Sequence, residues 1–143
     1  MRKLSVLGFA LMVGGLVGMF YVGALLLPLP AVIAVQASAV LLMLWARITF
    51  GRRSFHPAAT PTAGGLVNTG PYRYVRHPIY AAVLFFAWPG AIAHRSPQAL
   101  GFAVLISLGA VVRMLCEEHL LVRQYPEYAE YARTTKRMIP HVI

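Results

Sequence analysis

A long run without charged residues constrains the fold of this chain more than any other feature. Leu4 to Ala46 covers 43 positions and contains no Asp, Glu, Lys or Arg. A helix needs about 20 apolar residues to cross a bilayer, so the run is long enough for two crossings. Pro28 and Pro30 stand between the two halves, where proline would interrupt a continuous helix. The run therefore predicts an N-terminal helical hairpin over residues 4–48.

A second apolar region, from Pro78 to Val112, is interrupted by the polar sequence His94-Arg95-Ser96-Pro97. Its halves hold 16 and 17 uncharged residues, so we expect both helices to extend into their polar flanks. Only 12% of the residues are charged, against about 25% in soluble domains. We predict an all-α integral membrane protein with one domain, residues 1–143, and four transmembrane helices in two hairpins, 4–48 and 78–116.

This topology places almost all of the basic residues on one side of the membrane. Every lysine and arginine except Arg95 falls on the side of the membrane that holds the two termini. Because cytoplasmic segments carry the excess of basic residues, both termini are predicted to be cytoplasmic. Anionic membrane lipids are then the expected partners of these residues, and nucleic acid is not. The apolar run after Arg2 and Lys3 is too long for a signal peptide, so we expect a retained helix.

A cytoplasmic loop is predicted over residues 49–77. It is rich in glycine and proline, including Gly51, Pro57, Pro61 and Gly64. A loop of this length is often functional, and a disordered linker is the alternative. Apolar and aromatic residues near its end favour an ordered, packed segment.

The cytoplasmic tail, residues 117–143, contains all four acidic residues of the protein: Glu117, Glu118, Glu127 and Glu130. Pro126 fits the first turn of a helix, with Lys136 and Arg137 near the end of that helix. Tyrosines at positions 125, 128 and 131 would share one face of it. We therefore predict an interfacial amphipathic helix that rests on the membrane surface or on the loop.

One polar motif precedes the second apolar region. Arg76, His77 and Tyr80 surround Pro78, which fits the first turn of a helix. The N–H groups at such a helix start attract anions and carboxylates. The motif indicates either a ligand site or a structural cap.

The second polar motif, Glu117-Glu118, follows Arg113 by four and five residues. A salt bridge from Arg113 to Glu117 is the simplest interpretation. One arginine cannot engage both carboxylates, so we expect at least one of them to bind another cation. Carboxylates at membrane depth are costly and often mark functional sites. The histidines are not at metal-ligand spacing, so no metal site is predicted.

Taken together, the two motifs resemble those of the isoprenylcysteine carboxyl methyltransferase family. The resemblance rests on the sequence from Gly70 to Tyr80, the apolar hairpin, and these residues of the tail: Glu117, Glu118, Leu121, Tyr125, Glu127, Tyr128, Tyr131, Arg137 and Pro140. Related membrane phospholipid methyltransferases share the Arg-His-Pro and Glu-Glu elements, although they continue with glycine where this chain has Ala82. The resemblance covers residues 60–140, the expected methyltransferase core, and implies a compact prokaryotic member in the inner or cell membrane.

The resemblance implies methyl transfer from S-adenosylmethionine, which leaves S-adenosylhomocysteine. The cofactor would be held at the cytoplasmic face by residues of the loop, the third helix and the acidic pair: Leu66, Val67, Tyr72, Arg76, His77, Pro78, Tyr80, Glu117, Glu118 and Leu121. Arg137 or Arg113 would orient a carboxylate acceptor, and Glu127 would position that arginine or the acceptor. The acceptor, an isoprenylcysteine-like acid or another isoprenoid or lipid, would enter from the bilayer. A phenol or amine acceptor would need a base, either His77 or a glutamate.

Two other functions fit parts of this pattern. An NADPH-dependent membrane reductase of the steroid-reductase type has a similar C-terminal region, but paired carboxylates oppose the phosphate charge of that cofactor. A non-enzymatic membrane scaffold explains the hairpins but not the ionisable groups gathered at one end. Thermal stabilisation by one cofactor or the other separates these functions, since a ligand that binds the folded state raises apparent stability.

Overall fold

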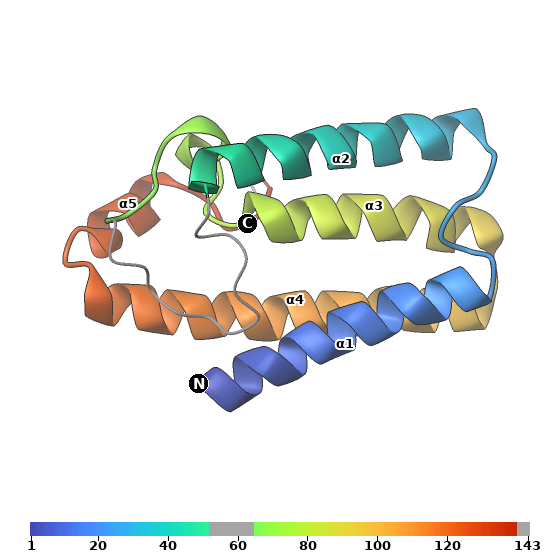
Figure 1. The fold of residues 1–143 in the computed structure, drawn as a ribbon, viewed down its shortest axis with the longest axis horizontal. Coiled ribbons are helices and arrows are strands. Elements are labelled where there is room, and N and C mark those ends of the chain that lie inside the picture. The colour runs from blue at the N-terminus through green and yellow to red at the C-terminus, as the bar shows by residue number, and fades with distance from the viewer. Residues whose placement is uncertain (52–64, 140–143) are drawn as a thin grey trace.

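The computed structural model describes residues 1–51 and 65–139, and this part of the chain is all-helical (Figure 1). Its elements are α1 (Arg2–Tyr21), α2 (Pro30–Phe50), the 3₁₀ helix η2 (Gly70–Arg73), α3 (Pro78–His94), α4 (Pro97–Gln124) and α5 (Tyr128–Thr134). Within the described ranges, extended pairing is limited to a single bridge between Val75 and Lys136. The predicted all-α class is confirmed.

Prolines set the starts of three long helices. Pro30, Pro78 and Pro97 each stand in the first turn of a helix, where a missing N–H costs no hydrogen bond. The Ser96 hydroxyl also accepts a hydrogen bond from the Ala99 N–H at 3.2 Å and caps α4. The predicted break between the first two helices is confirmed, because α1 ends at Tyr21 and α2 begins at Pro30.

The helices do not pack mainly in the order in which they are connected. The most extensive contacts join α1 to α4 and α2 to α3, and α3 also packs on α4 (Figure 1). The two helices of the first predicted hairpin therefore have different main partners. The start of α1, the end of α2, the start of α3 and the end of α4 lie at one end of the bundle, together with α5.

Three helices, α1, α2 and α4, are long and apolar enough to cross a membrane, and α3 is a shorter apolar helix of 17 residues. Large apolar side chains on the outside of the bundle include Leu41 and Ile48. Soluble proteins rarely expose apolar surface on this scale, whereas lipid chains cover it. These features are those of a membrane protein.

Glycine permits the close approach of α1 to α4. A Cβ on Gly15 would lie 2.9 Å from the backbone oxygen of Phe102, and one on Gly8 would lie 2.8 Å from the oxygen of Gly109. By contrast, a Cβ on Gly14 would meet no atom within 4 Å. Gly8 and Gly15 thus mark the face of α1 that contacts α4, and Gly14 lies off that face.

Two matched substitutions test this packing. Gly15→Ala should lower the thermal unfolding temperature in detergent, because overpacking costs about 1–3 kcal/mol and alanine recovers at most about 1 kcal/mol of helix propensity. Gly14→Ala should leave the temperature unchanged or raise it, because only the propensity gain applies. Equal shifts in the two variants would contradict the packing of α1 on α4.

The tail differs from its prediction. Helix α4 continues to Gln124, eight residues beyond the predicted end of the second hairpin, so both members of the acidic pair lie within a helix. The following helix α5 begins at Tyr128 instead of Pro126 and ends at Thr134. Lys136 and Arg137 lie after α5, because Thr135 is extended and the chain turns to pair with residues 75–77. Pro57, Pro61, Gly64 and Pro140 lie outside the described residues.

Candidate active site

The two polar motifs meet at the end of the bundle that holds α5. Arg76 and His77 immediately precede α3, and Glu117 and Glu118 lie on the last part of α4. Because α3 packs along α4, its start lies beside the acidic pair. The charged side chains that the sequence singled out are therefore neighbours in space.

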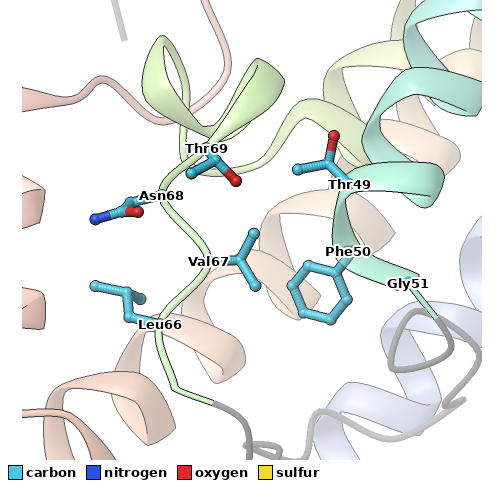
Figure 2. Close-up of a pocket in the computed structure, with 7 residues that line it drawn as sticks. All are labelled: Thr49, Phe50, Gly51, Leu66, Val67, Asn68 and Thr69. Atoms are coloured by element: carbon cyan, nitrogen blue, oxygen red, sulfur yellow. The ribbon is translucent and has the colours of Figure 1, made fainter.

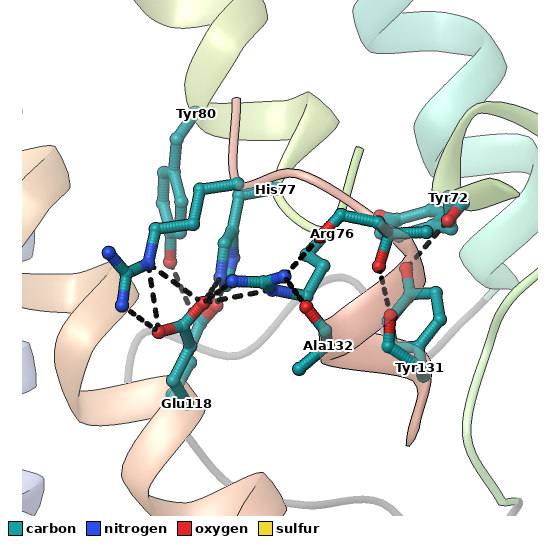
Figure 3. Close-up of polar contacts among 10 residues, drawn as sticks. Tyr72, Arg76, His77, Tyr80, Glu118, Tyr131 and Ala132 are labelled. Atoms are coloured by element: carbon teal, nitrogen blue, oxygen red, sulfur yellow. Dashed lines mark hydrogen bonds and ion pairs between the residues drawn. The ribbon is translucent and has the colours of Figure 1, made fainter. Parts of the chain in front are cut away.

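Glu118 is the centre of this cluster. Its carboxylate pairs with Arg76 (Nη2 to Oε1, 3.0 Å), with Arg137 (Nη2 to Oε2, 3.0 Å) and with His77 (Nε2 to Oε1, 3.3 Å) (Figure 3). The Nε atom of Arg137 also donates to Oε2 at 3.1 Å, so this arginine binds the carboxylate through two nitrogens. The Glu118 side chain is only 13% exposed. Both oxygens of Glu118 are thus occupied by cationic or ring nitrogen donors.

Arg76 ties the C-terminal segment to the start of α3. Its Nη1 atom donates to the Ala132 oxygen at 2.8 Å and to the Thr135 oxygen. The backbone N–H groups of residues 76 and 77 donate to the oxygens of residues 136 and 137, at 2.7 and 2.8 Å. We call residues 135–139 the C-terminal strap. Met138 of the strap packs against Tyr80 and its apolar neighbours, so the strap lies over the polar cluster.

Glu117 forms a second, adjoining network. The Tyr80 hydroxyl donates to its Oε1 atom, and Arg113 approaches the same oxygen at 3.4 Å. Arg113 also donates from Nε to the Tyr80 hydroxyl at 2.8 Å and lies over the ring of Phe9, 5.3 Å from its centroid. The predicted Arg113–Glu117 pair is confirmed. Glu117 is the more open acid, with 27% of its side chain exposed.

Aromatic residues join the cluster to the loop. The Tyr131 hydroxyl donates to the Tyr72 backbone oxygen at 2.6 Å (Figure 3). The Tyr72 ring packs on Phe50 with centroids 5.5 Å apart. Burial raises the pKa of Tyr131 to about 12, and burial together with the Glu117 charge raises the pKa of Tyr72. Both phenols are therefore neutral near pH 7. The tyrosine face was predicted to rest on the membrane surface or on the loop, and at Tyr131 the structure has a contact with the loop.

An open pocket of about 490 Å³ lies where the end of α2 meets the loop. Figure 2 shows its lining: Thr49, Phe50, Gly51, Leu66, Val67, Asn68 and Thr69. Phe50 also contacts Tyr72, so the pocket adjoins η2. Leu66 and Val67 were expected near a ligand. The residues that the end of α2 adds to the pocket were not expected, because no local sequence pattern shows that two distant segments meet.

The structure brings together seven of the residues expected at the site: Arg76, His77, Tyr80, Arg113, Glu117, Glu118 and Arg137. Pro78 is buried at the first position of α3, and Leu121 is partly buried one turn after Glu117. Glu127 is exposed at the start of α5, and no polar contact joins its side chain to the cluster in the described part of the chain. Phe9 contributes to this region without a sequence signal for doing so, because it lies over Arg113 from α1. Tyr128 was expected on a packing face, and the structure buries it near the cluster.

Ion pairs join the charged groups of this cluster. Among residues 1–51 and 65–139, no group of three or more His, Cys, Asp and Glu side chains is arranged to hold a metal ion. Arginine donors occupy the carboxylates instead. The arrangement can hold charged and polar groups of a ligand beside a bundle with an apolar exterior.

A family model described as phospholipid methyltransferase matches residues 20–128. The match begins well before residue 60, where the resemblance described above began, and so includes α2. It ends before the C-terminal strap.

Two curated proteins are similar over 82 residues. The nickel-cobalt-cadmium resistance protein NccN of Alcaligenes xylosoxydans xylosoxydans is 39% identical, over 54% of this chain and 37% of its own length. The cobalt-zinc-cadmium resistance protein CzcN of Cupriavidus metallidurans is 37% identical, over 54% of this chain and 36% of its own length. The alignments thus span little more than a third of each relative. No solved structure matches the chain significantly.

Proposed function

This chain belongs to the phospholipid methyltransferase family, and from that premise we propose that it transfers a methyl group from S-adenosylmethionine to a lipophilic acceptor. The favoured acceptor group is the carboxylate of an isoprenylcysteine-like or other lipid acid. One observation carries the proposal: the Arg-His-Pro-x-Tyr sequence before α3 meets the Glu-Glu pair of α4 at one end of an apolar bundle.

The residues at this end suit the cofactor chemically. The pocket beside η2 has a volume typical of small-molecule sites, with the apolar side chains of Phe50, Leu66 and Val67 beside the polar Asn68 and Thr69. Apolar walls and an aromatic ring suit an adenine base, and the polar side chains suit ribose hydroxyls. The pocket adjoins η2 through Tyr72, and the pKa of Tyr72 is raised by burial and by the nearby charge of Glu117.

The two acids have different roles in this proposal. Glu118 is occupied by Arg76, His77 and Arg137, so we assign it to holding the strap and the start of α3 in place. Glu117 is more exposed and would bind the cationic amino group of the cofactor. Pro78, Tyr80 and Leu121 would shape the site around it.

The bound cofactor supplies a methyl group on a positively charged sulfur that is already a good leaving group. The protein therefore needs mainly to align the acceptor and exclude water. A carboxylate acceptor needs no base, and Arg137, which is 42% exposed, or Arg113 would orient it. Glu127 would position an arginine or the acceptor only if the strap or the acceptor moved toward it. An amine or phenol acceptor would require His77 or a glutamate to accept a proton.

We also propose that α3 crosses the membrane in addition to α1, α2 and α4, which makes four crossings. Both termini and the site would then lie on the cytoplasmic side. Apart from Arg95, the basic residues of the described segments belong to the helix ends and connections on the side of the bundle that holds the site, and such residues are typical of cytoplasmic segments. The acceptor would then reach the site from the bilayer. A prokaryotic inner or cell membrane is the proposed location.

Thermal unfolding of the purified protein in detergent tests the choice of cofactor. S-adenosylmethionine and S-adenosylhomocysteine should each raise the unfolding temperature in a concentration-dependent manner, because a ligand at 100 times its Kd adds about 2.7 kcal/mol. NADPH should have no effect. Stabilisation by NADPH alone would favour the reductase, stabilisation by Ni²⁺ or Co²⁺ alone would favour metal binding, and no response to any ligand would favour a scaffold.

A further inference from the structure

One buried polar group near the site has no partner. Tyr128, the first residue of α5, is only 2% exposed, and its hydroxyl has no hydrogen-bond partner among the described residues. Leaving a buried hydroxyl unpaired destabilises the folded protein, so such groups usually have a reason to persist. A ligand that accepts a hydrogen bond from the hydroxyl is one such reason.

The charges around Tyr128 indicate which kind of ligand. Arg76 and Arg137 share the single carboxylate of Glu118, and all three charges act on the Tyr128 hydroxyl. Two guanidinium groups for one carboxylate leave an excess of positive charge. Burial and the Glu118 charge raise the pKa of Tyr128, so the phenol keeps its proton and can donate it in a hydrogen bond.

We propose that the Tyr128 hydroxyl and the Arg137 guanidinium together bind a carboxylate group of a ligand. This inference rests on the proposed function, which offers two sources of a carboxylate: the amino-acid end of the cofactor and an acidic acceptor. Arg137 can receive a ligand because it is 42% exposed, unlike Arg76, which is 10% exposed. Arginine binds carboxylates well through its planar pair of donors. Tyr128 is a binding residue in this account.

Tyr128→Phe tests the inference, because it removes the hydroxyl and keeps the ring. The ligand-free variant should be as stable as the wild type or more stable, since an unpaired buried hydroxyl is lost. Its affinity for the carboxylate-bearing ligand, measured by calorimetry, should fall about tenfold or more. Tyr74→Phe is the matched control, because Tyr74 is exposed and its variant should bind normally.

Two pairs of probes distinguish the sources. S-adenosylhomocysteine is compared with its decarboxylated counterpart, and a farnesylated N-acetylcysteine is compared with its neutral amide. In one of the two pairs, Tyr128→Phe should weaken binding of the acid and leave binding of its neutral counterpart unchanged. That pair then identifies the ligand that supplies the carboxylate. If the wild type binds S-adenosylhomocysteine and the farnesylated acid but Tyr128→Phe binds both equally well, the inference is wrong and the proposed function stands. If the wild type binds none of the probes, the proposed function fails.

Discussion

Glu118→Gln is expected to release the C-terminal strap from the start of α3. The substitution removes the negative charge that Arg76, His77 and Arg137 share in a largely buried position. Breaking a buried ion pair by removing one partner costs about 3–5 kcal/mol, because the other charges remain without compensation. Amide exchange at residues 76 and 77 should accelerate, since their N–H groups donate to the oxygens of residues 136 and 137. The unfolding temperature should fall as well.

Glu130→Gln is the matched control for this substitution. Glu130 pairs with Arg133 at 3.5 Å on the exposed surface of α5, where an ion pair is worth little. This variant should have the exchange rates and unfolding temperature of the wild type. Unchanged exchange at residues 76 and 77 in Glu118→Gln would contradict the role of Glu118 in holding the strap.

Glu117→Gln is expected to weaken cofactor binding with a smaller effect on the fold. Glutamine can still accept the hydrogen bond from Tyr80, and Arg113 keeps its own bond to the Tyr80 hydroxyl. The lost negative charge matters for a cationic ligand, because hydrogen bonds between charged groups contribute about 1.5–3 kcal/mol. Affinity for S-adenosylhomocysteine, measured by calorimetry, should therefore fall at least about tenfold.

Comparison of the two acids separates their roles. Amide exchange at residues 76 and 77 should stay slow in Glu117→Gln and become fast in Glu118→Gln. If Glu117→Gln bound the cofactor with the wild-type affinity, Glu117 would be excluded as a ligand of the cofactor. Equal effects of the two substitutions on both exchange and affinity would show that the acids act as one unit.

The fold was predictable where local chemistry decides it. Charge-free runs located the long helices, Pro28 and Pro30 marked the break between the first two, and Pro78 marked the start of α3. The choice of packing partners was not predictable, because every long helix is apolar on most of its surface. Close approach of α1 to α4 depends on which glycines face the neighbour, and Gly14 and Gly15 look alike in the sequence.

The site was predictable as a set of motifs, but only one of its ion pairs could be predicted. Arg113 and Glu117 could be paired from helical spacing alone, and the structure has that pair. The pairing of Glu118 with Arg137 depends on the path of the chain after α5, where the predicted helix is replaced by an extended strap. Tyr128 was placed on a packing face, and its unpaired hydroxyl is visible only in three dimensions.

Methyl transfer to lipid is the most direct test of the central claim. The purified protein is incubated with methyl-labelled S-adenosylmethionine and a bacterial lipid extract, and the lipids are separated and counted. The account predicts label in a lipid product that depends on the protein and is greatly reduced by Glu117→Gln. Labelled lipid that forms equally with wild type and variant, or none despite demonstrated cofactor binding, would contradict the account.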